Sequence, residues 1–136
     1  MDVGTEWLVD AKGCREDLLA DPQKLREICD QIVADLDLHV IGKPLFHKFP
    51  APGGVTAIYL LTESHLTLHT YPESGIATFN LYCCKPRPRW PWKDRLEEKL
   101  WAAEVRVRCA QRGLTKDNSV QERPEQSSIP HKGGAR

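Results

Sequence analysis

Three runs of strand-like sequence in the middle of the chain constrain its fold more than any other feature. They are VTAIYLL at 55–61, SHLTLHT at 64–70 and GIATFNLYCC at 75–84. β-Branched and aromatic residues are frequent in them, as is typical of strands, and residues 71–74 (YPES) separate the second run from the third. Together with TEWLVDA at 5–11 and HVIGKPLFHKF at 39–49, they predict a sheet of four or five strands.

Two further segments have the apolar spacing of amphipathic helices. Asp21 supplies an N-cap and Pro22 a favourable first-turn residue for the first of them. Its inward-facing residues are Leu25, Ile28, Cys29, Ile32, Val33 and Leu36. The second helix is predicted within DRLEEKLWAAEV at 94–105. Because an apolar helix face must cover another layer, we expect an α/β fold, a two-layer sandwich with an antiparallel or mixed sheet and helices on one face.

The length and charge of the chain limit its organisation and its partners. With 136 residues the chain is long enough for one domain, which we expect at 1–113, followed by a polar and disordered tail at 114–136. Lys plus Arg and Asp plus Glu number 19 each, so the formal net charge is zero. Without a global field, we expect a small-molecule partner rather than nucleic acid or a membrane surface.

The N-terminus and the cysteines favour a reducing, cytoplasmic setting. MDVGTEWLVDAKGC lacks the cationic start and apolar run of a secretory signal, and no stretch approaches the roughly 20 apolar residues of a membrane span. The five cysteines form no CxxC pair, and their odd number argues against a closed disulfide framework. His65 and His69 have zinc-ligand spacing only on a helix, and their segment is strand-like, so no metal is expected.

Alternation along the predicted strands separates polar from apolar faces. Glu6 and Asp10 share one face of the run at 5–11. Cys84 falls on the polar face of its run, whereas the neighbouring Cys83 falls with apolar residues. Ser64 and the histidine at 69 are five positions apart, so a regular strand would point them to opposite faces. We therefore expect a bend or bulge between these two residues if they act together.

The segment ESHLTLHTYPE at 63–73 carries the most specific pattern in the chain. FHKF at 46–49 and GVT at 54–56 precede it, and Cys84 follows twenty positions after Ser64. In this motif and its flanks the chain resembles the S-adenosylmethionine decarboxylase proenzymes of bacterial type, from about residue 4 to residue 113.

This resemblance implies that the chain cuts itself between Glu63 and Ser64. The Ser64 hydroxyl would attack the Glu63 carbonyl to form an ester, with Thr56 assisting, and His69 would remove the serine α-proton so that the ester is eliminated. Loss of ammonia would leave a covalent pyruvoyl cofactor at residue 64. That ketone would form a Schiff base with the substrate amine, and Cys84 would protonate the α-carbon after carbon dioxide leaves.

The resemblance also implies substrate-binding residues and a partner. Phe49 and Tyr71 occupy candidate positions for aromatics that stack on adenine, and Glu73 the position of a glutamate that holds the ribose. Glu6 and Asp10 lie where acids of related enzymes help to bind a stimulatory diamine. The expected assembly is a homodimer with its sheets meeting and its active sites near the interface. The expected activity is decarboxylation of S-adenosylmethionine, which supplies the aminopropyl donor for spermidine synthesis.

Two alternatives stay open at this point. The first is a pyruvoyl-dependent arginine or ornithine decarboxylase on the same scaffold, in which Glu6 and Asp10 hold the distal cation of the substrate. The second is a non-catalytic binding or regulatory protein that remains one uncut chain. The chain departs from the usual family pattern at Tyr71, where tryptophan is usual, and at Thr56, where serine is frequent.

Overall fold

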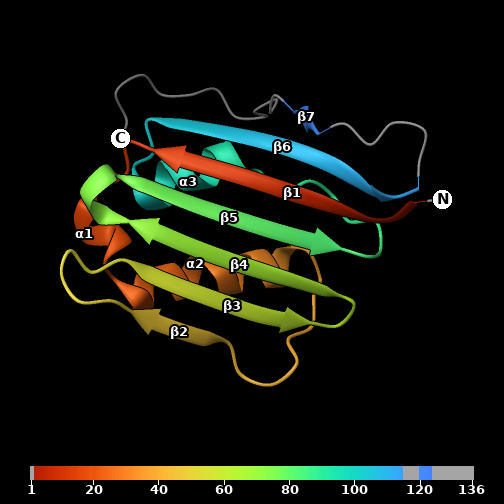
Figure 1. Ribbon diagram of the computed structural model, residues 1–136, viewed down its shortest axis with the longest axis horizontal. Helices are drawn as coiled ribbons and strands as arrows, with labels where there is room; N and C mark the ends of the chain where they lie inside the picture. Colours follow the sequence, from red (N-terminus) through yellow and green to blue (C-terminus); the bar gives the residue numbers. More distant parts are fainter. Residues whose placement is uncertain (1, 115–119, 124–136) are drawn as a thin grey trace.

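The computed structural model describes residues 2–114 and 120–123, which form one sheet with helices on one of its faces (Figure 1). All pairs of neighbouring strands in the sheet are antiparallel. The predicted two-layer α/β sandwich is therefore confirmed, and the sheet is of the antiparallel kind. In the view of Figure 1 the helices lie behind the sheet, so its other face is open.

The sheet places the motif strand among its inner strands. The strands are β1 (Asp2–Lys12), β2 (Leu45–Lys48), β3 (Val55–Leu61), β4 (Ser64–Tyr71), β5 (Ile76–Cys83), β6 (Glu104–Gly113) and β7 (Gln121–Glu122). Their order across the sheet is β2-β3-β4-β5-β1-β6-β7. Strand β4 has a hydrogen-bonded neighbour on each side, so its register is fixed twice, by β3 and by β5.

The helical layer covers the sheet as the apolar spacing predicts. Its elements are α1 (Glu16–Leu19), α2 (Pro22–Asp35), the 3-10 turn η1 (Pro72–Ser74) and α3 (Trp92–Leu100). Helix α2 begins at Pro22 because the Asp21 carboxylate accepts hydrogen bonds from the backbone N–H groups of Gln23 and Lys24, at 3.0 and 3.3 Å. The buried residues of this helix are Leu25, Ile28, Cys29 and Ile32. Each such side chain contributes roughly 1.5–3 kcal/mol of hydrophobic stabilisation.

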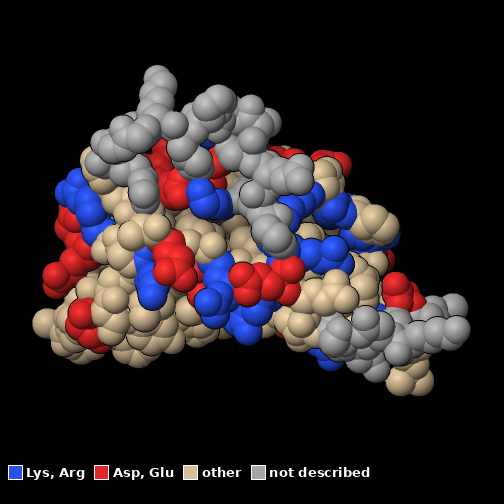
Figure 2. Space-filling view, turned by 90° about the horizontal axis from the view of Figure 1, so that it is seen from above, with Lys and Arg blue, Asp and Glu red and all other residues tan. Residues whose placement is uncertain are grey.

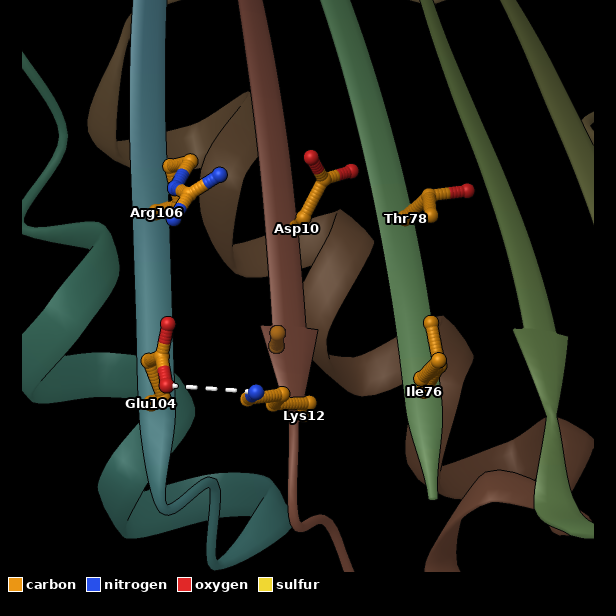
Figure 3. Close-up of a pocket in the computed structure, with 7 residues that line it drawn as sticks. Asp10, Lys12, Ile76, Thr78, Glu104 and Arg106 are labelled. Carbon is orange, nitrogen blue, oxygen red and sulfur yellow. Dashed lines mark ion pairs between the residues drawn. The ribbon is translucent and has the colours of Figure 1, made fainter. Parts of the chain in front are cut away.

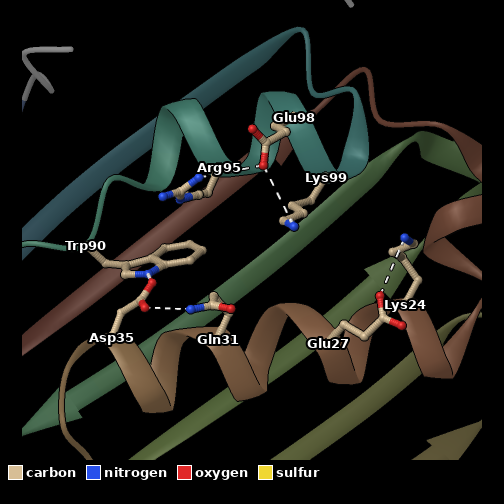
Figure 4. A network of polar contacts seen from close by, with 8 residues as sticks. All are labelled: Lys24, Glu27, Gln31, Asp35, Trp90, Arg95, Glu98 and Lys99. Atoms are coloured by element: carbon tan, nitrogen blue, oxygen red, sulfur yellow. Dashed lines mark hydrogen bonds and ion pairs between the residues drawn. The ribbon is translucent and has the colours of Figure 1, made fainter. Parts of the chain in front are cut away.

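A polar contact joins the connector after β5 to the helical layer. The Trp90 indole N–H donates to the Asp35 carboxylate at 2.9 Å, and the Gln31 amide donates to the other oxygen of that carboxylate at 2.6 Å (Figure 4). The Trp90 ring is buried and packs edge-on against Trp92, with ring centroids 5.0 Å apart. The proline-rich connector is thus anchored between α2 and the start of α3.

The structure differs from the sequence-based expectation at two boundaries. Helix α3 begins earlier than predicted, at Trp92, and stops at Leu100 because Trp101 adopts a left-handed backbone with φ of 62°. The predicted tail lies mostly on residues 115–119 and 124–136, outside the described part of the chain. Within it, Gln121–Glu122 form β7 against β6 instead of leaving the sheet.

The surface carries both charge signs. Figure 2 shows acidic and basic side chains next to one another in the view over the β6 edge of the sheet, without a broad area of one sign. This mixture agrees with a formal net charge of zero. Among the described residues, no helix has the length and apolar character needed to cross a membrane.

Candidate active site

The predicted cleavage point lies in a two-residue turn between β3 and β4. Leu61 pairs with Ser64, so Thr62 and Glu63 make the whole turn. Glu63 has a φ of 60°, in the left-handed region that costs a residue with a side chain roughly 1–2 kcal/mol. The Glu63 carbonyl oxygen accepts a hydrogen bond from the backbone N–H of Cys84 at 3.2 Å. The peptide bond before Ser64 is therefore held in a strained turn with a donor on its carbonyl.

Two adjacent cysteines beside this turn have different surroundings. Cys83 pairs with Ser64 across β4 and β5 and is buried. Burial is the main cause that raises the pKa of the Cys83 thiol above its ordinary value, which keeps it protonated. Cys84 follows the end of β5 and is exposed. Of the two thiols, the one at Cys84 is accessible to a substrate from solvent.

A basic residue that the sequence analysis did not single out also contacts the turn. The Lys85 ammonium lies 3.5 Å from a carboxylate oxygen of Glu63. Lys85 directly follows Cys84, whose N–H bonds to the Glu63 carbonyl. The antiparallel pairing of β4 with β5, read from the hairpin spacing, is the signal that would have placed Lys85 beside the turn.

His69 and Thr56 lie together, but at the other end of the sheet. They are paired across β3 and β4, and the Thr56 hydroxyl is 3.1 Å from His69 Nδ1. Strand β4 runs from Ser64 to Tyr71 in continuous register with both neighbours, so the bulge expected between Ser64 and His69 is not present. The two residues are about 17 Å apart along the strand, at roughly 3.3 Å per residue. Within one chain, His69 does not reach the turn.

The aromatic and acidic candidates for substrate binding lie at the same end as His69. Tyr71 ends β4, and Glu73 follows it in η1, with both side chains exposed. Phe49 follows β2, is half exposed, and packs edge-on against His47 with ring centroids 4.5 Å apart. Its backbone N–H donates to the Gly54 carbonyl at 2.8 Å, which fixes it near the start of β3. The predicted site residues thus fall into two groups at opposite ends of β4.

The two acids of β1 face the open side of the sheet, where each has a basic partner. Arg112 donates to Glu6 at 2.7 Å, and Arg108 donates to Asp10 at 2.9 Å. The Asn80 amide also donates to Glu6, at 2.8 Å. This bond from Asn80 is the largest cause that lowers the pKa of Glu6, with Arg112 adding to it against the opposing effect of burial. The sequence analysis missed these partners, although Arg108 and Arg112 lie on β6, the strand that pairs with β1.

A hollow on the open face lies beside the end of the sheet that carries His69. The hollow has a volume of about 250 Å³ that water-sized molecules can enter. Asp10, Thr78 and Arg106 lie in a row on β1, β5 and β6 (Figure 3), and Lys12 pairs with Glu104 at 3.4 Å below them. The lining side chains carry charges of both signs. Nowhere in 2–114 or 120–123 do three or more His, Cys, Asp or Glu side chains gather as metal ligands.

The sequence and the fold of this chain are those of a known class of protein. A family model described as S-adenosylmethionine decarboxylase matches residues 5–113. That range covers all of the sheet except the start of β1 and the short β7. The chain belongs to the S-adenosylmethionine decarboxylase family.

Individual relatives agree with this assignment. The chain is 34% identical over 120 residues to the S-adenosylmethionine decarboxylase proenzyme of Pyrococcus furiosus, covering 87% of this chain and 84% of the relative. It is 34% identical over 114 residues to that of Moorella thermoacetica, covering 82% and 89%. The crystal structure of the adenosylmethionine decarboxylase from Aquifex aeolicus superposes with a TM-score of 0.69 at 27% identity, covering 87% and 97%.

The Glu6 contacts predict a pH-dependent stability. Folding lowers the pKa of Glu6, so its carboxylate stabilises the fold at pH values above its ordinary pKa near 4.5. This contribution is lost as the pH falls through the lower pKa of the folded state. Asn80→Ala removes the largest cause, so the pKa of Glu6 rises. Unfolding at pH 7 should show the variant less stable than wild type, with a smaller difference at pH 3. NMR titration of the Glu6 carboxyl should give the same direction.

Thr78→Ala is the matched control, because Thr78 is two residues away on the same face of β5 and does not contact Glu6. An unchanged Glu6 titration in Asn80→Ala would contradict the assigned cause.

Proposed function

We propose that this chain is a proenzyme that cuts itself between Glu63 and Ser64, and that the processed protein decarboxylates S-adenosylmethionine. One observation carries the proposal. The Glu63 carbonyl, which the Ser64 hydroxyl has to attack, lies in a left-handed turn and accepts the Cys84 N–H. A strained peptide bond with a fixed donor on its carbonyl oxygen fits an intramolecular acyl shift.

The first step requires little movement of the folded chain. The Ser64 hydroxyl rotates about one side-chain bond and attacks the carbonyl carbon of the neighbouring Glu63. The carbonyl oxygen gains negative charge during this attack, and the N–H of Cys84 is already aimed at it. Breaking the carbon–nitrogen bond then gives an ester between Glu63 and Ser64. A base removes the α-proton of residue 64, and the ester is eliminated as the Glu63 carboxylate.

The residues beside the turn fit the pyruvoyl group that this elimination leads to. Once formed, the group supplies a ketone that withdraws electrons from an amine substrate. Residue 64 then begins a new chain at the start of β4, near the exposed Cys84, whose backbone N–H contacts the Glu63 carbonyl. We assign to the Cys84 thiol the proton that the α-carbon of the substrate takes up. The buried Cys83 keeps its proton and contributes to packing.

The pairing of the β1 acids favours S-adenosylmethionine over arginine or ornithine as substrate. A distal guanidinium or ammonium needs an unpaired carboxylate, but Glu6 and Asp10 are held by Arg112 and Arg108. Displacing either arginine would leave a charge without its partner, which weakens binding. An adenine ring instead needs a flat apolar surface, which the exposed rings of Phe49 and Tyr71 offer. Glu73 lies beside Tyr71 and is the residue that we assign to the ribose.

A second copy of the chain would bring the two groups of residues together. If two copies stack with their open faces together, a two-fold axis that lies between the sheets and perpendicular to the strands relates them. The turn before Ser64 in each copy then lies over the end of the partner's sheet that carries His69. Because β4 is an inner strand, Ser64 of one copy then approaches Thr56 and His69 of the other. Exposed apolar side chains of Leu45, Ile58 and Leu60 lie on this open face and favour burial. We therefore propose a homodimer with two shared active sites.

Substrate preference tests the proposed activity. Carbon dioxide release should be observed from S-adenosylmethionine. Release from arginine or ornithine should be near background, because Arg112 and Arg108 hold Glu6 and Asp10, the two acids expected to receive their distal cation. Activity with arginine or ornithine alone would show the related decarboxylase instead. No release from any of the three would favour a binding protein.

Cys84→Ala should separate processing from turnover. The backbone N–H of position 84 remains, so the chain should still be cut, whereas loss of the proton donor should lower kcat by about 10²- to 10⁴-fold. Intact-mass analysis and carbon dioxide release measure the two effects. Cys109→Ala, at a buried position on β6, is the control and should retain kcat. Full activity of Cys84→Ala would rule out the assigned role.

Co-expression of Ser64→Ala and His69→Ala chains tests the shared site. Neither variant should be cut when expressed alone. In a mixed dimer, one site combines an intact Ser64 with an intact His69, so about half of the His69→Ala chains should be cut in an equal mixture. A mass tag on one chain identifies the product. The shared site is refuted if His69→Ala chains stay whole in the mixture. It is also refuted if they are cut when expressed without Ser64→Ala chains.

A further inference from the structure

Lys85 lies where self-cleavage creates a new negative charge. Its ammonium is 3.5 Å from one carboxylate oxygen of Glu63, and both side chains are more than half exposed. An exposed pair of this kind contributes little to the stability of an uncut chain. The residue before Lys85 donates its N–H to the Glu63 carbonyl. Cys84 and Lys85 thus contact both the backbone carbonyl and the side-chain carboxylate of Glu63.

The proposed reaction changes the charge at this place. In the uncut chain, the Glu63 carbonyl belongs to a neutral amide. The acyl shift makes it an ester, and elimination leaves it as a carboxylate while residue 64 becomes a dehydroalanine. Addition of water and loss of ammonia then give the ketone. Glu63, now the last residue of its fragment, therefore carries two carboxylates, where it carried one before.

We propose that Lys85 is a positioning residue that acts as the counter-ion of the Glu63 terminal carboxylate and keeps this cut end on the Cys84 N–H. The inference rests on the proposed self-cleavage. Glu63 already contacts Lys85 through its side chain, so the cut end needs no large movement to be held. The N–H of Cys84 and the Lys85 ammonium together provide two donors for a carboxylate, and a charged donor strengthens such a pair.

The counter-ion also affects the substrate. An amino acid that reaches the ketone at residue 64 brings its own α-carboxylate close to the two carboxylates of Glu63. Like charges at short distance oppose binding, and a cation beside them reduces this repulsion. Without Lys85, substrate binding should weaken at low salt and recover at high salt, because ions screen exposed charges.

The test compares processed wild-type protein with Lys85→Gln, Lys85→Arg and Lys24→Gln. Lys24 is the matched control, because it is also 3.5 Å from an exposed glutamate, Glu27, but lies on α2. Intact mass first establishes that each protein is cut. Hydrogen exchange of the Cys84 amide then reports whether the cut end is held, and KM is measured at low ionic strength and at about 1 M salt.

Lys85→Gln should exchange the Cys84 amide faster and raise KM by about two- to fivefold at low salt, with little difference at high salt and unchanged kcat. Lys85→Arg should restore both values, and Lys24→Gln should match wild type. Unchanged exchange and KM in a cut Lys85→Gln protein would overturn this inference alone. So would a Lys85→Gln chain that stays whole while wild type is cut, because the charge would then be needed before cleavage. An uncut wild-type chain would overturn the proposed function as well.

Discussion

The register of β4 between β3 and β5 is the constraint on which the rest of the site depends. It pairs Ser64 with Leu61 on one side and with Cys83 on the other, so only two residues remain for the turn. This short connection puts Glu63 into a left-handed conformation and its carbonyl under the N–H of Cys84. A shift of one residue in this pairing would move the side chains of β4 to the opposite faces of the sheet. Ser64 would then no longer pair with Leu61 and Cys83. The chemistry of the turn is therefore a consequence of how the sheet pairs.

The same register explains why the candidate residues do not meet in one chain. Strand β4 has eight residues, with Ser64 at its first position and His69 at its sixth. Its residues are held on both sides by hydrogen bonds, so β4 cannot fold back to bring the ends together. A second chain running in the opposite direction is the simplest way to place a histidine over each serine. Dimerisation and catalysis would then depend on the same open face.

The local elements were predictable because short-range interactions determine them. Asp21 and Pro22 fixed the start of α2, and the alternation at 55–84 fixed three strands and their faces. The burial of Cys83 and the exposure of Cys84 could be predicted for the same reason. The resemblance supplied the site residues, whose roles stay predictions.

What could not be predicted depends on pairing between distant parts of the chain. Arg108 and Arg112 neutralise Asp10 and Glu6 only because β1 and β6, about a hundred residues apart, are neighbours. The expected bulge between Ser64 and His69 is absent because β4 pairs in continuous register with β3 and β5, which lie elsewhere in the chain. Lys85 was missed because it follows β5, whereas its partner Glu63 lies in the turn between β3 and β4.

The mass of the purified wild-type chain tests the central claim most directly. We expect two fragments, one ending at Glu63 and one starting at residue 64 with a blocked N-terminus that reacts with a hydrazine as a ketone does. A Ser64→Ala chain prepared in parallel should keep its full mass. A wild-type protein that runs as one unbroken polypeptide, without a hydrazine-reactive carbonyl, would contradict the account.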